Sequence, residues 1–383
     1  MAVYLDYAAT TPTDPRVVQA MLPYFTEAFG NPSSVYSFGR ETKQAVLKAR
    51  EEVALLLGAA PEEIFFTSGG SESDNWALCG LSAANAEKGR HIVTSAVEHH
   101  AVINTAEYLR TQGVDVTVLP VDGEGRVRPS DLRKALRDDT VLVSIMAANN
   151  EVGTIQPLKE LAEIAHDRGA LFHTDAVQAA GHIPMNVNEL GIDALSLSGH
   201  KLYGPKGTGV LYVRKGTSVF PLVYGGGQER GLRGGTENVP GIVGLGAAAF
   251  LAREEMESEM KRLGIMRDEF IASAVSSIDG CYLNGASGAE RLPGNINLRF
   301  DGVSSDSLLI RLDIEGYAVS AGSACSAGAV EPSHVLSAMG LSDTEAKSAI
   351  RITVGRYTKP EELHDFLNIL QKSVREIRLA SIG

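Results

Sequence analysis

SGHKLYGPKG, residues 198–207, places Lys201 directly after a short segment with the pattern of a strand. Residues 194–198 read ALSLS and alternate apolar and hydroxyl side chains, while the glycines and the proline after Lys201 predict a turn. A lysine at a strand end has a rigid support, and lysine amines form Schiff bases with aldehyde cofactors such as pyridoxal phosphate. Ser198 and His200 could donate hydrogen bonds to the phosphate of such a cofactor. The alternative is an ordinary solvated loop lysine.

The rest of the first 240 residues alternates short apolar runs with amphipathic stretches typical of helices. Seven runs have the length and composition of strands: Ile64–Phe66, His91–Thr94, Val114–Leu119, Val141–Ala147, Leu171–Thr174, Ala194–Leu197 and Val210–Val213. This alternation predicts an α/β fold with a mostly parallel seven-stranded sheet. In such sheets the functional residues gather at the carboxyl ends of the strands.

A second, smaller region follows. A charged helical segment, residues 254–273, leads to three further strand-like runs at Gly294–Phe300, Tyr317–Ser320 and Ile350–Val354. A chain of 383 residues also exceeds what one hydrophobic core usually supports. We therefore predict a large domain over residues 15–255 and a small α+β domain formed by residues 1–14 and 256–383.

Composition excludes several classes of protein. The 47 acidic residues outnumber the 35 basic ones, giving a net charge of -12 without blocks of like charge, which argues against nucleic acid and membrane as partners. The longest apolar run, residues 241–252, is too short to span a bilayer, and we expect a cytoplasmic protein. Three cysteines without a CxxC pair predict neither a disulfide framework nor a metal site.

A glycine turn follows the first predicted strand, in TSGGSESDN at residues 67–75. Gly69 and Gly70 precede Ser71, and Asp74 lies three residues further on, which predicts a capping box at the start of a helix. The free N–H groups of a helix start can bind an anion such as phosphate. Such a turn is also common without any ligand.

Two more polar residues follow predicted strands. Asp175 ends the run at residues 171–174, and a carboxylate in apolar surroundings needs a cationic or donor partner, such as a protonated pyridine nitrogen. Its alternative role is to cap the next helix. His99 comes after the run at residues 91–94 and could stack on a cofactor ring or transfer protons, although a lone loop histidine can also be structural.

Cys325 lies in VSAGSACSAG, residues 319–328, a run of small residues that cannot pack tightly. We expect an exposed, mobile loop there, and an exposed thiol in such a loop is a candidate nucleophile. Cys79 and Cys281 fit the pattern of buried cysteines that pack as small apolar residues.

Eight segments occur in a recognisable order: TSGGSESDN, EHH, NNEVGTIQP, HTDAVQ, SGHKLYGPKG, GGGQERGLRGGTEN, SAGSACSAG and RITVGRYT. Together they resemble the cysteine desulfurases of the NifS/IscS group, within the class V aminotransferases of fold type I. The resemblance runs from LDYAATTP near the start to RITVGR near the end of the chain. It implies a homodimeric pyridoxal phosphate enzyme that converts L-cysteine to L-alanine. Sulfur would pass to a sulfur acceptor or to an IscU/NifU-like scaffold protein for iron–sulfur cluster assembly.

The resemblance also implies roles for individual residues. Lys201 would form the Schiff base and then act as the base, and Cys325 would carry the persulfide and could contact an iron–sulfur cluster transiently. Asp175 would pair with the pyridine nitrogen, Gln178 would donate to the phenolic oxygen and His99 would stack on the ring. Phosphate contacts would come from Gly70, Ser71, Ser198 and His200, with Thr236 supplied by the partner subunit. Asn150 would lie near cofactor and substrate, and Arg351 would clamp the substrate carboxylate.

Two positions depart from the family pattern. Relatives commonly have Ala-Thr where this chain has Gly70-Ser71, and Lys where it has His100. Ser71 keeps the hydroxyl, so phosphate binding is expected to survive, while the role of His100 stays open. The sequence also leaves open the sulfur acceptor, the preference between cysteine and selenocysteine, the turnover rate and the need for an activating partner.

Three other interpretations remain to be weighed. Another class V enzyme, such as a transaminase or selenocysteine lyase, would keep Lys201 and Asp175 but would not require Cys325. A non-enzymatic platform for sulfur-carrier proteins would not need an intact Lys201. A dinucleotide-binding dehydrogenase would carry GxGxxG after its first strand, and this chain does not.

Overall fold

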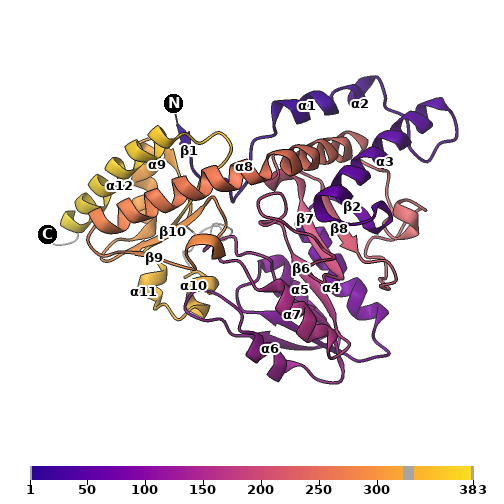
Figure 1. Cartoon of the computed structure of the whole chain (residues 1–383), viewed down its shortest axis with the longest axis horizontal. Coiled ribbons are helices and arrows are strands. Elements are labelled where there is room, and N and C mark those ends of the chain that lie inside the picture. Colours follow the sequence, from indigo (N-terminus) through magenta and orange to yellow (C-terminus); the bar gives the residue numbers. More distant parts are fainter. Residues whose placement is uncertain (1, 322–331, 381–383) are drawn as a thin grey trace.

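The computed structural model describes residues 2–321 and 332–380 of the chain. It has a large and a smaller part, joined by the long helix α8 (Val239–Ser277), which runs along both (Figure 1). Cys325, the predicted nucleophile, lies outside the described residues.

The large part is built on a seven-stranded sheet. Its order is β2 (Ile64–Thr67), β8 (Gly209–Val213), β7 (Ala194–Ser198), β6 (Leu171–Asp175), β5 (Thr140–Ser144), β3 (His91–Ser95) and β4 (Asp115–Leu119). Only β8 runs antiparallel to its two neighbours within this sheet. The predicted mostly parallel α/β fold is confirmed, because each of the seven predicted runs forms a strand.

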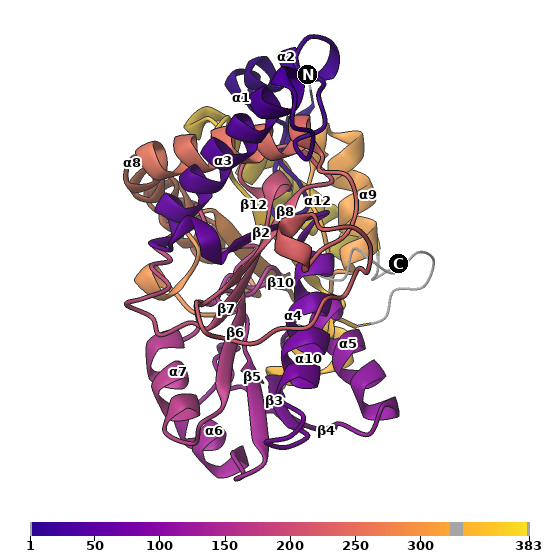
Figure 2. The same ribbon diagram turned by 90° about the vertical axis from the view of Figure 1, so that its right-hand side faces the viewer.

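Helices cover both faces of this sheet (Figure 2). On one face α4 (Gly70–Ala84) and α5 (His100–Thr111) pack around the fully buried Trp76. On the other face lie α3 (Ser37–Leu57), α6 (Pro129–Ala135), α7 (Leu158–His166) and the first half of α8. Strand side chains alternate between these two cores: Phe65 joins the α4 side and Phe66 the α3 side. A period of two is what a strand buried on both faces requires.

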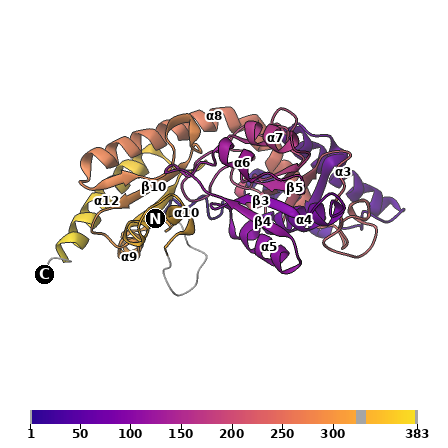
Figure 3. The same cartoon turned by 90° about the horizontal axis from the view of Figure 1, so that it is seen from below.

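The smaller part contains a three-stranded antiparallel sheet in the order β12 (Ala349–Thr353), β10 (Asn295–Phe300) and β9 (Cys281–Leu283). Its core also includes α9 (Ser305–Ile314), α12 (Pro360–Ala380) and the second half of α8 (Figure 3). Two short helices, α10 (His334–Ala338) and α11 (Asp343–Ala346), lie toward the large part.

The N-terminal segment belongs to both parts. β1 (Val3–Tyr4) pairs in parallel with β11 (Tyr317–Ala318), and the N–H of Ala8 donates to Oγ1 of Thr353 over 2.8 Å. Further along, the segment continues into α1 (Pro15–Met21) and α2 (Pro23–Thr26), which lie over α8. This path carries residues 6–11 between the two sheets.

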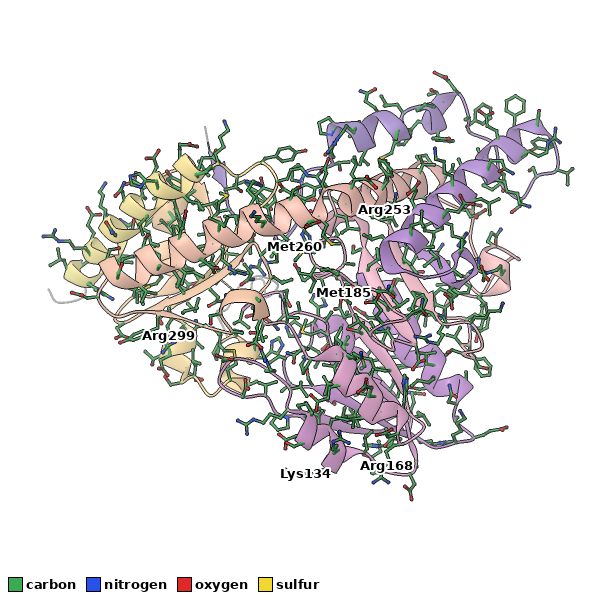
Figure 4. The ribbon with its side chains drawn as sticks, in the orientation of Figure 1. Lys134, Arg168, Met185, Arg253, Met260 and Arg299 are labelled. Carbon is green, nitrogen blue, oxygen red and sulfur yellow. The ribbon has the colours of Figure 1, made fainter. Side chains whose placement is uncertain are left out.

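Helix α8 spans 39 residues and is longer than the sequence pattern predicts. The side chain of Asn238 caps it by accepting from the N–H of Gly241, over 3.2 Å. Gly246 lets α3 approach closely, because a Cβ there would lie 2.5 Å from Cα of Ala49. The predicted domain boundary after residue 255 falls inside this helix, between Arg253 and Met260 (Figure 4), so the division into two domains stays a prediction.

None of the helices within residues 2–321 and 332–380 combines the length and the apolar character that crossing a membrane requires.

Candidate active site

Two neighbouring parallel strands bring the predicted residues together. Asp175 is the last residue of β6 and Ser198 the last of β7, which β6 pairs with in parallel. A single 3₁₀ turn, η2 (Gly199–Lys201), then places Lys201 beside them. The carboxyl ends of parallel strands meet at one edge of a sheet, which is why these residues share a site.

Lys201 is buried and points to the N-terminal segment. Its Nζ donates to the carbonyl oxygens of Ala8 and of Ala9, the latter over 2.7 Å. Nε2 of Gln178 donates to the same Ala8 carbonyl over 3.0 Å. The amine and the amide predicted to hold one cofactor therefore meet at a shared acceptor.

His200 is also held by the N-terminal segment. Its Nδ1 lies 3.0 Å from Oγ1 of Thr10, within hydrogen-bond distance. Burial, together with the positive charges of Lys201 and Lys206, lowers the pKa of His200 to about 4. The imidazole is therefore neutral at physiological pH, and it can serve a phosphate as a hydrogen-bond donor but not as a cation.

Asp175 has the environment of a carboxylate that needs a positive partner. It is buried, and its Oδ1 accepts from the N–H of Val177 over 2.8 Å. Burial raises the pKa of this carboxyl, while the Val177 N–H and the charges of His99 and Lys201 act in the opposite direction. A cation beside Asp175 would remove the penalty of burying its charge.

His99 is the N-cap of α5, where its Nδ1 accepts from the N–H of Ala101 over 3.1 Å. A side-chain ring nitrogen of His99 and carboxylate oxygens of Asp74 and Asp175 all lie within 4.8 Å of one another. The predicted stacking residue thus lies next to the predicted partner of the pyridine nitrogen. Its neighbour His100, at a ring-centroid distance of 4.7 Å, contacts His334.

The predicted capping box after the glycine turn is wrong. Helix α4 begins at Gly70 with Gly69 as its N-cap, and Ser71 is exposed in the first turn. Glu72, not Asp74, reaches back, since its Oε2 accepts from the N–H of Ser68 over 2.9 Å. Asp74 is fully buried and faces the sheet. Among the residues that the structure describes no side chain caps this helix start, so its first N–H groups can still receive an anion.

Arg351 projects from the middle of β12 and is buried. Its Nη2 donates to Oδ1 of Asp6 over 2.9 Å, and its Nη1 donates to the carbonyl of Asn150 over 3.1 Å. Its Nε has no hydrogen-bond partner among the described residues. The guanidinium therefore keeps donor capacity for a further acceptor such as a carboxylate.

Thr236 has an exposed side chain in the loop between β8 and α8. The loop is tied down before it reaches Thr236, because Arg233 binds Glu72 (Nε to Oε1, 2.8 Å) and Arg50 binds the buried Glu229 over 2.8 Å. An anchored loop that presents a hydroxyl outward is suited to contact a second molecule.

Of the two cysteines within the described residues, Cys281 is buried on β9 and Cys79 is half-buried on α4. Burial raises the pKa of Cys79, and it raises that of Cys281 to about 11. Both thiols therefore stay protonated at neutral pH, which makes them poor nucleophiles.

The donor set fits pyridoxal phosphate. Lys201 offers an amine for the aldehyde, buried Asp175 an anion for the pyridine nitrogen, and Gln178 an amide donor for the phenolic oxygen. The uncapped start of α4 and the hydroxyl of Ser198 face the same strand ends. Each polar group of the cofactor thus has a chemical counterpart here.

Sequence reasoning missed several residues of this site. The carbonyls of Ala8 and Ala9, the Asp6 carboxylate and the buried Asp74 all take part in its contacts. The segment LDYAATTP marked the N-terminal part of the resemblance, but backbone carbonyls leave no side-chain signal.

The chain was compared with known proteins. The profile of the aminotransferase class V family matches residues 3–366. The cysteine desulfurase IscS of Dictyoglomus turgidum is 53% identical over 379 residues, covering 99% of this chain and 96% of that protein. A solved structure titled as a NifS-like protein superimposes with a TM-score of 0.91 at 40% identity, covering 97% of this chain and 99% of that one. SspA in complex with cysteine gives a TM-score of 0.81 at 38% identity, covering 93% and 99%. The chain belongs to the class V aminotransferases and, within them, to the cysteine desulfurase group.

Proposed function

We propose that this protein is a cysteine desulfurase that converts L-cysteine to L-alanine and carries the sulfur as a persulfide on Cys325. One observation carries the proposal: Lys201, Gln178 and buried Asp175 lie together just after the ends of β6 and β7. The first two donate to the same carbonyl, that of Ala8. The relatives named as cysteine desulfurases and the likeness to a protein solved with cysteine support this substrate.

Pyridoxal phosphate is the cofactor that we propose for this site. Lys201 would bind its aldehyde carbon, Asp175 its pyridine nitrogen and Gln178 its phenolic oxygen, with His99 against the ring and Asn150 nearby. The phosphate contacts would come from Gly70, Ser71, Ser198 and His200, and from Thr236 of a second subunit. When bound, the cofactor withdraws electrons from the substrate Cα and so makes its proton acidic.

The chain's own residues would then act in order. Arg351 would hold the substrate carboxylate with the help of its unpartnered Nε, and Lys201 would take the Cα proton. The Cys325 thiolate would attack the substrate sulfur, so that an S–S bond forms as the C–S bond breaks. The electron pair of the C–S bond stays with the substrate carbons, which take up protons and leave as alanine.

We further propose a cytoplasmic homodimer that delivers sulfur to an acceptor, such as an IscU/NifU-like scaffold for iron–sulfur clusters, with neither nucleic acid nor membrane as partner. The net charge of -12 supports the absence of polyanionic partners. The test of the central proposal is an absorption spectrum of the purified protein before and after adding cysteine, with alanine and sulfide measured in the same sample. A keto-acid product without alanine would instead indicate a transaminase.

Replacing Asp175 with Asn is expected to lower kcat by about 10²-fold or more, since this is the usual cost of losing one electrostatic contact to the reacting system. The shape of the side chain is kept, and the amide can still meet the Val177 N–H, so cofactor binding should persist. Steady-state alanine production and the cofactor absorbance measure the two effects. Unchanged turnover would mean that the ring does not lie against Asp175.

Replacing Arg351 with Lys is expected to raise KM for cysteine by roughly tenfold or more, because a charged hydrogen bond contributes about 1.5–3 kcal/mol and lysine cannot bind a carboxylate bidentately. Arg356 offers a matched control, since it is also paired with an aspartate, Asp14 at 2.6 Å, and the proposal gives it no contact with the substrate, so its substitution by Lys should leave KM unchanged. A normal KM for Arg351→Lys would place the substrate carboxylate elsewhere.

Mixed dimers test the shared site. A Lys201→Ala chain and a Thr236→Ala chain are each expected to be impaired, but a heterodimer of the two has one site with both residues intact. Mixing them after subunit exchange should therefore restore alanine production above that of either parent. Mass spectrometry of differently tagged chains verifies exchange, and mixtures that stay at parental activity despite it would show that Thr236 does not serve the neighbouring site.

A further inference from the structure

Beside His99 lies a cluster of three buried acids: Asp74 on α4, Asp175 on β6 and Glu98 before α5. The proposed function gives Asp175 a role and leaves the other two without one. Carboxylate oxygens of Asp74 and Asp175 lie within 4.8 Å of each other. Two carboxylates this close in a buried site do not both ionise readily, so a proton has to be divided between them.

The hydrogen-bond donors around the pair are unequal. Asp175 receives the Val177 N–H at 2.8 Å and lies close enough to Lys201 for the positive charge of the amine to favour its ionised form. Asp74 is 1% exposed, and its Oδ1 has no hydrogen-bond partner among the described residues. Only the hydroxyl of Ser196 on β7 favours an ionised Asp74. The surroundings therefore place the negative charge on Asp175.

The histidine nearest to Asp74 supplies no positive charge. Nε2 of His173 is 3.9 Å from Oδ1 of Asp74, but its two ring nitrogens face hydroxyls, Ser144 Oγ at 2.9 Å and Ser196 Oγ at 3.1 Å. Complete burial lowers the pKa of His173 to about 3, so the ring is neutral at physiological pH. Within the described part of the chain, Asp74 therefore has no cationic partner on the His173 side.

Glu98 is the third acid. It accepts from Oγ of Ser95 over 2.5 Å and from the N–H of Met146 over 3.0 Å. Burial nevertheless raises its pKa to about 8, and burial together with the charge of Asp175 raises the pKa of Asp74 well above its ordinary value. The groups that face Asp74 from the surrounding elements are thus Glu98, His99, His173 and Asp175, with Lys201 beyond.

We propose that Asp74 holds a proton in the folded protein and is a positioning residue that keeps Asp175 as the single negative charge of the cluster. The importance of that charge for catalysis rests on the proposed function, whereas the proton on Asp74 does not. With a second ionised carboxylate the cluster would carry more negative charge than Lys201 alone could balance.

Infrared difference spectra of the full-length protein at pH 7 test the proton directly. Asp74→Asn is expected to lose the carbonyl band of a protonated carboxylic acid, while Asp138→Asn, whose side chain is 99% exposed, should lose carboxylate bands. Glu98→Gln assigns the separate band of that residue. Loss of carboxylate bands in Asp74→Asn would overturn the proposal, as would one equivalent of a tightly bound divalent metal, which would require both carboxylates to be ionised.

A second measurement does not depend on the folding of Asp74→Asn. In Asp175→Asn the neighbouring negative charge is gone, so the Asp74 band should disappear at a lower pH than in the parent protein. An unmoved band would show that the two acids are not coupled. These spectra need neither cofactor nor cysteine, and they therefore stand even if no desulfurase activity is found.

Linkage gives a third measurement. Because the pKa of Asp74 is raised in the folded state, the folded protein keeps a proton that the unfolded chain has already released. The free energy of unfolding therefore falls as the pH rises from about 4 toward the pKa that Asp74 has in the folded protein. Over that pH range Asp74 should multiply the equilibrium constant for unfolding of the parent protein by about ten for each pH unit. Asp74→Asn should lack this contribution. With cofactor bound, a plot of cofactor absorbance against pH should show one ionisation step fewer in Asp74→Asn than in the parent protein. Parallel curves would contradict the proposal.

Discussion

Lys201→Ala is expected to abolish alanine production from cysteine, with a loss of about 10⁴-fold or more, the upper range of what a positioned base contributes. The loss should be large because the proposal gives one amine two tasks, to bind the cofactor and to move the Cα proton. The purified variant should also lack the absorption of a covalently bound cofactor. Alanine release is measured in single-turnover mixtures together with the spectrum.

The structure supplies a matched control for this variant. Lys206 is also a lysine of the same turn whose Nζ lies 3.4 Å from a carbonyl of the N-terminal segment, that of Thr11, yet it is exposed. Lys206→Ala should retain cofactor and activity. Because Lys201 binds the Ala8 and Ala9 carbonyls, thermal unfolding should accompany the assay to separate lost chemistry from lost packing. Retained activity in Lys201→Ala at normal stability would remove the lysine from the mechanism.

Cys325→Ser should be equally inactive, but the reaction should stop at a later step than in Lys201→Ala. It is expected to bind cofactor, to respond to cysteine with a change in absorbance, and to retain a normal affinity for cysteine through Arg351. It should form no persulfide and release essentially no alanine, because the hydroxyl of a serine at neutral pH cannot replace a thiolate as the sulfur acceptor. The pair of variants therefore divides the reaction into a step before and a step after proton removal.

Cys79→Ser and Cys281→Ser are the controls for this prediction. Cys281 is buried, Cys79 is half-buried and burial raises the pKa of both thiols, so their loss should affect stability at most. Mass spectrometry after one turnover without a thiol acceptor should find the added sulfur on the peptide containing Cys325. Sulfur on either of the other cysteines, or full activity in Cys325→Ser, would favour a lyase or transaminase instead.

The large sheet could be predicted because its strands are buried on both faces and carry their pattern locally. Asp175, Ser198 and Lys201 could be placed for the same reason, since each follows such a strand directly. Helix α8 was harder. Its apolar first half packs against α3 in the core of the large part and its second half is charged on one side, so the change in surroundings makes one helix look like two segments.

Other features depend on contacts that no local pattern reveals. Asp74 has the spacing of a capping residue but lies against β6 and β7, and tertiary burial outweighs the cap. β1 has only two residues, and its partner β11 lies more than 300 positions later in the chain. The Ala8 carbonyl accepts hydrogen bonds from Lys201 and Gln178 only because the backbone passes close to them, and no side chain signals this.

The path of residues 3–8 has a consequence for synthesis on the ribosome. These residues emerge first, yet their partners, Tyr317, Arg351 and Thr353, are among the last to be made. At roughly 5–20 residues per second, the interval is on the order of 20 to 70 s. During that time the large sheet can form, but neither the Asp6–Arg351 pair nor the Ala8–Thr353 contact can. A nascent chain therefore positions Arg351, the proposed substrate clamp, only at the end of translation, and truncated products keep the Lys201 strand end without it.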